Sequence, residues 1–330
     1  MTQRYVAGVS GLEEILARLE PLLGGLAGEP VPLSGGITNH NFRVTLGDGD
    51  YVVRVHGKDT DLLGIDREAE QLASGLAADM GIAPELVAAF DDCLVTRFVA
   101  CDPVIPREIA EHVDEIARAL RSFHDSPATL PARFWVPDLL QDYAALVRER
   151  GVRLPDAFGR AAAVAARIAA VLPLRDPRPC HNDLLTSNVI RAHSNGMLIV
   201  DWEYAGMGHP CFDLGNLSVN NGFDEHADER LLSAYYDEPP SDERRAALAL
   251  MRVMSDAREA AWGVVQAEIS ELDFDFSRYA RTHFERLDAA VEQPQLREWL
   301  AAAGAAGDAT AASEPAGTER DLEGHDGQTA

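Results

Sequence analysis

The apolar pattern of the chain changes once, near residue 100, and this change limits the folds that are open to it. Before that point, short runs rich in aromatic and β-branched residues are separated by glycine-rich turns, which is typical of strands. Beyond about Pro106, apolar residues recur at spacings of three and four, which is typical of helices. A chain of 330 residues is long enough for two lobes. The pattern therefore predicts an α+β fold with a small antiparallel sheet in the first lobe and a mainly helical second lobe.

The first lobe is expected to span residues 1–99 and to contain a hairpin. The hairpin signal is Gly47-Asp48-Gly49-Asp50, between expected strands at Asn41–Leu46 and Tyr51–His56. The other elements expected here are helices at Leu12–Leu23 and about Ile65–Met80, and strands near Leu86–Phe90 and Cys93–Val99.

The second lobe is expected to span residues 100–302. The helices expected in it are Ile109–Phe123, Leu139–Arg150, Phe158–Leu172, Leu231–Tyr236, Arg244–Ile269 and Tyr279–Leu300. Residues 303–330 are rich in Ala, Gly, Thr, Asp and Glu and contain almost no large apolar side chains, so they predict a disordered acidic tail.

Polar residues in the second lobe form a pattern that suits phosphoryl transfer. The run HNDLLTSN occupies residues 181–188, and a short apolar run follows and ends in Asp201-Trp202-Glu203. Transfer of a phosphoryl group from ATP to an alcohol needs a carboxylate that orients the hydroxyl and accepts its proton, and oxygen ligands that hold Mg²⁺. Asp183 suits the first task, whereas Asn188 and Asp201 suit the second. The alternative is that Asp183 and Asn188 only cap turns.

The segments HNDLLTSN and IVDWEYAGMGHPCFDLGN resemble the catalytic segment of the choline/ethanolamine kinase group, within the aminoglycoside-phosphotransferase-like superfamily. The resemblance implies a two-lobed protein kinase-like fold. It implies Asp183 as catalytic base, Asn188 and Asp201 as magnesium ligands, and Glu203 as a carboxylate at the metal site. It also implies that Asp213 is structural and ties the following helix to the catalytic loop.

The nucleotide half of such a site is expected in the first lobe. Ser34, Gly35, Gly36, Thr38 and Asn39 precede the first hairpin strand in an SGGxTNxN pattern. Glycines let the backbone approach a phosphate closely, although a Gly-Gly pair alone also marks an ordinary turn. The full pattern resembles the phosphate-proximal loop of the choline kinase group.

A buried ion pair is expected beside that loop. Alternation in the strand Tyr51–His56 places Arg54 at its middle, where a cation can pair with nucleotide phosphates. On the next helix Glu68 shares a face with Ile65, Leu72 and Leu76, so we expect Glu68 to pair with Arg54. The alternative is that both charges are solvated. Kinase-like folds bind adenine on the connector between the lobes, which here contains Thr96, Arg97, Phe98 and Val99.

The acceptor end of the site is expected on Tyr204, Glu259 and Trp262. The resemblance places Tyr204 and Trp262 at positions where the choline kinase group surrounds an amine with aromatic rings. Where that group has a further Trp, this chain has Glu259, which can accept hydrogen bonds from a primary amine. The pattern therefore favours ethanolamine slightly over choline. The alternatives are that Trp262 is a core residue and that Glu259 is a surface charge.

Charge and composition limit the kinds of molecule that the protein is expected to bind. The net charge of −25 argues against nucleic acid and anionic membranes and fits a cationic acceptor. No apolar run reaches the length of a membrane span, so we expect no membrane insertion and a cytoplasmic location. The four cysteines lack metal-ligand spacing and are expected to be buried thiols.

The sequence thus predicts an ATP- and Mg²⁺-dependent kinase of a small amino alcohol, ethanolamine or choline. Two alternatives stay open. One is a kinase of another alcohol, such as thiamine or an aminoglycoside, and the other is a non-catalytic module that binds nucleotide.

Overall fold

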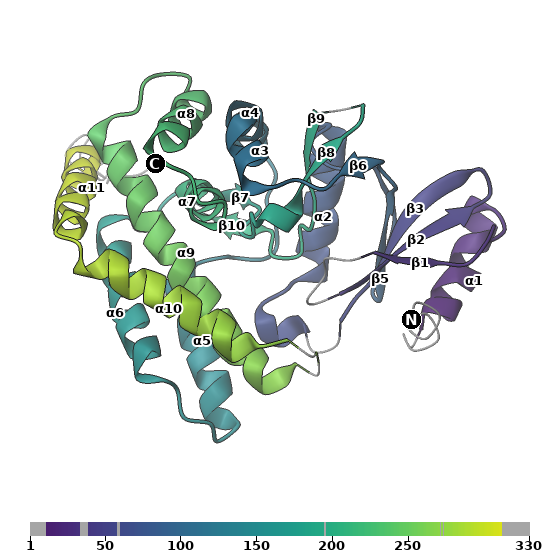
Figure 1. The fold of residues 1–330 in the computed structure, drawn as a ribbon, viewed down its shortest axis with the longest axis horizontal. Helices are drawn as coiled ribbons and strands as arrows, with labels where there is room; N and C mark the ends of the chain where they lie inside the picture. The colour runs from purple at the N-terminus through teal and green to yellow at the C-terminus, as the bar shows by residue number, and fades with distance from the viewer. Residues whose placement is uncertain are drawn as a thin grey trace, which may run out of the picture.

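The computed structural model describes residues 11–33, 39–57, 60–194, 196–270, 272 and 274–311. Figure 1 shows a strand-rich lobe at one end of the molecule and a larger helical lobe at the other, which confirms the predicted α+β, two-lobed fold. Within these described ranges no helix is both long and apolar enough to cross a membrane.

The first lobe is built on one antiparallel sheet of five strands in the order β1-β2-β3-β5-β4. The strands are β1 (Val31–Leu33), β2 (His40–Leu46), β3 (Gly49–Val55), β4 (Leu86–Phe90) and β5 (Cys93–Arg97). The predicted hairpin is confirmed, because Leu46 pairs with Gly49 and Gly47 takes a left-handed φ of 55° in the turn between them. Helix α1 (Leu12–Leu23) packs its apolar stripe on the sheet, with Leu19 fully buried near Phe42.

Helix α2 (Arg67–Asp79) connects the two lobes through small side chains. Ala69, Ala73 and Ala77 are fully buried and pack with apolar residues of the second lobe, whereas Leu72 is 48% exposed. Alanines at a spacing of four let a helix approach its neighbours closely. The buried face of α2 is therefore the alanine face and not the predicted face with Leu72. A short 3-10 helix, η3 (Thr60–Leu63), precedes α2.

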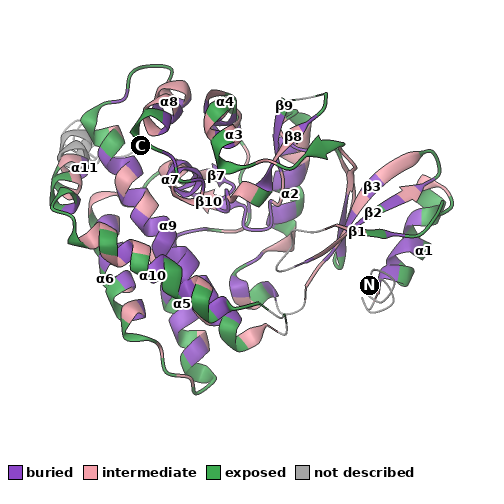
Figure 2. Cartoon of the chain, in the orientation of Figure 1, coloured by how far each residue is buried: buried purple, intermediate pink, exposed green. Residues whose placement is uncertain are grey.

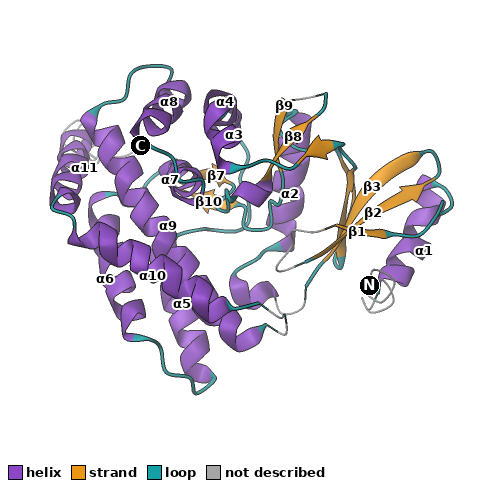
Figure 3. Ribbon diagram, viewed as in Figure 1, coloured by secondary structure: helices purple, strands orange, loops and turns teal. Residues whose placement is uncertain are grey.

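Short strands surround the catalytic motif in the second lobe (Figure 3). One antiparallel sheet joins β6 (Cys101–Asp102), β8 (Val189–Ala192) and β9 (Gly196–Ile199). A two-stranded sheet joins β7 (Arg178–Cys180) to β10 (Gly206–Gly208), and the 3-10 helix η4 (Thr186–Asn188) lies between β7 and β8. The division between the lobes at residues 99 and 100 stays a prediction.

Helix α9 (Asp242–Ile269) runs through the second lobe and is buried on nearly all sides between Val253 and Gly263, as the purple ribbon in Figure 2 shows. A helix that is buried all round belongs to the core. It packs against α5, α6, α7, α10 and α11. The remaining helices are α3 (Pro106–Glu111), α4 (Val113–His124), α5 (Val136–Glu149), α6 (Asp156–Val171), α7 (Pro210–Asn220), α8 (Glu225–Tyr236), α10 (Phe276–Glu292) and α11 (Gln295–Ala311).

Several boundaries differ from the prediction; α8, for example, begins at Glu225 and not at Leu231. The expected helix Ile109–Phe123 is divided into α3 and α4 at His112. The expected helix Tyr279–Leu300 is divided into α10 and α11, because Pro294 cannot continue a helix and Gln293 before it is extended. Helix α11 reaches Ala311, so the predicted disorder is wrong for residues 303–311, where alanines favour helix and Ala303 is buried. Residues 312–330 lie outside the described residues.

Candidate active site

The catalytic loop after β7 is held by a carboxylate from α7. Asp213 accepts hydrogen bonds from the backbone N–H groups of His181 and Asn182, both at 2.7 Å, and one from His124 Nε2 at 2.9 Å. Asn182 itself has a left-handed φ of 67°. These bonds confirm that Asp213 is a structural tie between α7 and the loop.

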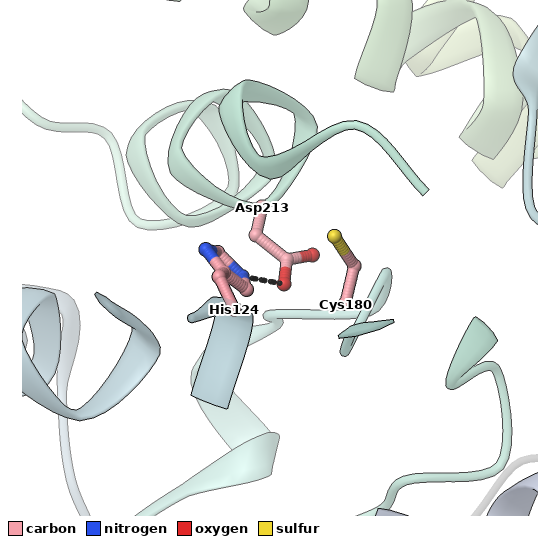
Figure 4. Close-up of side chains that lie close together, drawn as sticks. All are labelled: His124, Cys180 and Asp213. Atoms are coloured by element: carbon pink, nitrogen blue, oxygen red, sulfur yellow. Dashed lines mark hydrogen bonds and ion pairs between the residues drawn. The ribbon is translucent and has the colours of Figure 1, made fainter. Parts of the chain in front are cut away.

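Figure 4 shows that His124, Cys180 and Asp213 lie together at this tie. Their ligand atoms are within 4.8 Å of one another, which is close enough to hold a metal ion. The oxygens of Asp213 are already engaged, however, and His124 Nδ1 is paired with the Tyr235 hydroxyl at 2.8 Å. Burial raises the pKa of the Cys180 thiol well above its ordinary value. We therefore interpret the group as part of the structural core.

His181 fixes the loop from inside. Its Nδ1 accepts a hydrogen bond from the Asp183 N–H at 3.1 Å, so its Nε2 donates to the Val200 carbonyl at 3.0 Å. Burial lowers the pKa of His181, which favours the neutral ring. His181 therefore ties the catalytic loop to Val200, which follows β9.

Asp183 lies at the centre of the site and is buried. Asn188 Nδ2 donates to Asp183 Oδ2 at 3.0 Å and to the Asp183 carbonyl at 2.8 Å, while Arg258 Nη1 donates to Asp183 Oδ1 at 3.2 Å. Burial raises the pKa of Asp183 well above its ordinary value, and the guanidinium of Arg258 opposes that rise. The carboxylate is therefore fixed in orientation by two neighbours.

Asp201 follows β9 and has a left-handed φ of 68°, which is uncommon for a residue other than glycine. Such strain persists where the surrounding structure fixes it, and it often occurs at functional sites. Its Oδ1 lies 2.8 Å from Arg54 Nη1 but accepts no well-formed hydrogen bond from any residue that the structure describes. Together Asn188, Asp201 and Glu203 offer only oxygen ligands, the type that magnesium prefers. The donor set and the free lone pairs on Asp201 therefore fit a magnesium ion.

The predicted partner of Arg54 is wrong. Glu68 is exposed, whereas Glu70 is 1% exposed and accepts a hydrogen bond from Arg54 Nη1 at 2.8 Å. The prediction took the wrong face of α2 to be the buried one. Glu70 lies on the alanine face, which is the face that is buried. Burial alone would lower the pKa of Arg54, but the carboxylates of Asp201, Glu70 and Glu203 raise it above its ordinary value. Arg54 therefore stays charged at the junction of the lobes.

Arg67, at the start of α2, is a further member of this network that the sequence did not reveal. Its Nη1 donates to Glu70 Oε2 at 2.6 Å and lies 3.6 Å from Glu203 Oε2. Asn39 Nδ2 also donates to Glu203 Oε2, at 2.6 Å. Burial and the nearby Asp201 raise the pKa of Glu203 to about 7. Since Glu203 comes from the second lobe and its partners from the first, these contacts join the two lobes.

The acceptor residues form a second buried group beside Asp183. Trp262 Nε1 donates to the Tyr204 hydroxyl at 2.8 Å, and the Tyr279 hydroxyl donates to Glu259 Oε2 at 2.7 Å. Arg258 Nη1 donates to Glu259 Oε1 at 2.8 Å. The structure thus brings the three predicted acceptor residues together, and Glu259 is not a surface charge. Arg258 and Tyr279 were missed, although the adjacent charges at 258 and 259 inside an apolar helix were a usable signal.

Other predicted nucleotide residues are placed only in part. Ser34, Gly35, Gly36 and Thr38 lie outside the described residues. Thr96 and Arg97 end β5, while the Arg97 and Phe98 N–H groups donate to the carbonyls of Glu85 and Asp50. The binding of adenine at Thr96, Arg97, Phe98 and Val99 stays a prediction. Of the four cysteines, Cys93 and Cys180 are buried and Cys211 is half-buried, but Cys101 is exposed, so the expectation of a buried thiol was wrong there.

Comparison with known proteins agrees with this geometry. A model of the phosphotransferase enzyme family matches residues 29–249. The solved structure of a choline/ethanolamine kinase family protein from Mesorhizobium loti is 31% identical, with a TM-score of 0.75, and the match covers 89% of this chain and 99% of that one. Two relatives are an ethanolamine kinase from Drosophila melanogaster (31% identity over 72% of this chain and 53% of that protein) and a probable choline kinase from Arabidopsis thaliana (25% identity over 78% and 85%).

These matches cover both lobes and confirm the resemblance first seen in the two catalytic segments. They also support phosphoryl transfer to an alcohol as the general reaction, which removes the reading of a non-catalytic module. The chain belongs to the choline/ethanolamine kinase family of phosphotransferases.

Proposed function

We propose that the protein transfers the γ-phosphoryl group of ATP, with Mg²⁺, to the hydroxyl of a small amino alcohol, with a primary amine such as ethanolamine preferred to choline. The observation that carries the proposal is the position of Asp183. Its carboxylate contacts Asn188 on one oxygen and Arg258 on the other, so it stands between the predicted magnesium ligands and the acceptor residues.

Each residue has one task in this reaction. Asp183 orients the acceptor hydroxyl and takes its proton as the oxygen forms a bond to the γ-phosphorus and the bond to the departing ADP breaks. Asn188 and Asp201 are the residues that would hold Mg²⁺, which neutralises charge on the phosphates. Arg54, held by Glu70, supplies a fixed positive charge beside Asp201. Asn39 and Arg67 hold Glu203 at the same junction.

The charges of the site support a cationic acceptor. On the acceptor side, away from the predicted magnesium ligands, the described residues include two carboxylates, Asp183 and Glu259, and one guanidinium, Arg258. An excess of carboxylates in a buried site favours a ligand of positive charge. Glu259 can accept hydrogen bonds, which a primary amine donates and the quaternary ammonium of choline does not.

The test is an ATP-consumption screen with Mg²⁺ over ethanolamine, choline, thiamine, amino sugars and aminoglycosides. We expect the highest kcat/KM with ethanolamine. Turnover of thiamine or an aminoglycoside alone would replace the proposed acceptor. The absence of turnover with any alcohol, from protein that binds ATP, would overturn the assignment of Asp183 as base.

A further inference from the structure

Arg258 is a buried cation for which the proposed reaction gives no obvious use. It lies on the central helix α9, is 1% exposed and is one of the largest fully buried side chains of the described chain. Its Nη1 is 2.8 Å from Glu259 Oε1 and 3.2 Å from Asp183 Oδ1, and its Cζ lies 4.3 Å from the ring centroid of Tyr204. The guanidinium therefore has two carboxylates at its end and an aromatic face beneath it.

These surroundings have the chemistry of an ammonium-binding site. Carboxylates combined with an aromatic face are the groups that bind an organic cation. The walls are fixed from behind, because the Tyr204 hydroxyl accepts from Trp262 and the second oxygen of Glu259 accepts from Tyr279. In this chain the cation in that position is the protein's own side chain.

We infer that Arg258 determines acceptor specificity: its guanidinium fills the position between Asp183, Glu259 and Tyr204 and excludes a quaternary ammonium group from it. The inference rests on the proposed function and extends it to the choice of amine. A protein interior is closely packed, so a trimethylammonium head would have to displace the guanidinium and its charge-assisted hydrogen bonds. A primary amine is smaller and can donate to free lone pairs on the same carboxylates.

The first experiment replaces the guanidinium without removing its hydrogen bonding. Among the described residues only Nη1 of Arg258 has hydrogen-bond partners, so the amide of Arg258→Gln can supply a comparable donor. We expect this variant to raise the ratio of kcat/KM for choline to that for ethanolamine about tenfold. The matched control is Arg252→Gln, on the same helix but paired with Asp228, and it should leave the ratio unchanged.

A binding measurement tests the role of Arg258 without depending on catalytic turnover. Isothermal titration calorimetry with tetramethylammonium chloride should show no binding to the wild-type protein at millimolar concentrations and binding at least about tenfold tighter to Arg258→Gln. Arg258→Lys, which keeps a cation in place, should resemble the wild type. If Arg258→Gln does not fold, Arg258→Met provides the same test with an apolar chain of similar length.

The outcomes separate the two proposals. An unchanged choline-to-ethanolamine ratio together with no gain in tetramethylammonium binding would overturn the inference, as would an equal loss of activity toward both acceptors. If the wild-type protein turns over neither amino alcohol, the proposed function fails, and the tetramethylammonium titration still decides whether Arg258 occupies an ammonium site.

Discussion

The phosphate half of the site, around Arg54, and the acceptor half, around Arg258, each bury an arginine among carboxylates, but the carboxylates come from different places in the chain. Arg54 pairs with Glu70 on α2 and with Asp201 in the segment after β9. These partners come from separate parts of the chain, so the two ion pairs join the lobes. Arg258 receives Glu259 from its own helix and Asp183 from the catalytic loop, within one lobe. Substitutions in the phosphate half should therefore affect the stability of the junction between the lobes, whereas substitutions in the acceptor half should affect which acceptor is used.

Asp183 contacts residues of both halves, so its replacement should lower kcat more than the other substitutions proposed below. Asp183→Asn keeps the shape of the side chain and removes the base, so kcat should fall about 10³-fold because a positioned general base contributes an effect of this order. ATP binding, measured by calorimetry, should change little. The control is Asp242→Asn in the exposed first turn of α9. Full activity in Asp183→Asn would show that neither half is organised around this carboxylate.

Substitutions in the two halves of the site should differ in their effect on the Mg²⁺ concentration that activity requires, and Asp201 tests this difference. We expect Asp201→Asn to raise the Mg²⁺ concentration needed for half-maximal activity by about 10²-fold, because a carboxylate ligand is replaced by a neutral amide. Glu259→Gln, in the acceptor half, should leave this Mg²⁺ requirement unchanged and raise KM for the amino alcohol. A titration of initial rates with Mg²⁺ measures both variants. An equal rise in the Mg²⁺ requirement of both variants would contradict the division of the site into a phosphate half and an acceptor half.

The neighbouring glutamates of α2 test the lobe junction directly. Glu70→Gln leaves Arg54 and Arg67 without their shared carboxylate, so the free energy of unfolding should fall by about 3 kcal/mol, the usual cost of breaking a buried ion pair. Glu68→Gln, two residues away and exposed, should change it by less than about 0.5 kcal/mol. Urea denaturation of both variants makes the comparison. A larger loss in Glu68→Gln would restore the partner predicted from the sequence.

The same two glutamates show what the sequence could and could not predict. Asp183, Asn188 and Asp201 could be proposed from the sequence because their residue types and spacing suit the chemistry of phosphoryl transfer. The partner of Arg54 was not, because the prediction oriented α2 by its large apolar residues. The helix instead buries Ala69, Ala73 and Ala77, since it packs closely against the second lobe.

Arg258 was missed for a related reason. An arginine in a helix is usually solvated, and although the adjacent Glu259 was visible in the sequence, only the tertiary structure brings Asp183 and the Tyr204 ring to Arg258. The break before Pro294 was also missed, although proline ends a helix whatever surrounds it and the signal was therefore present in the sequence. Local rules thus predicted the segments, and packing between the lobes decided which side chains meet.

Tyr279 gives the smallest and most specific test of the acceptor half. Tyr279→Phe removes one hydroxyl, whose hydrogen bond to Glu259 Oε2 measures 2.7 Å, and leaves the ring that packs on Trp262. We expect a loss of about 1 kcal/mol in the free energy of unfolding, the usual net value of such a bond. The freed Glu259 oxygen is then available to a substrate amine, so KM for ethanolamine should change while the Mg²⁺ requirement and KM for ATP stay constant. A change in KM for ATP without a change in KM for ethanolamine would show that Glu259 acts on the phosphate half, and the comparison between the two halves would have to be redrawn.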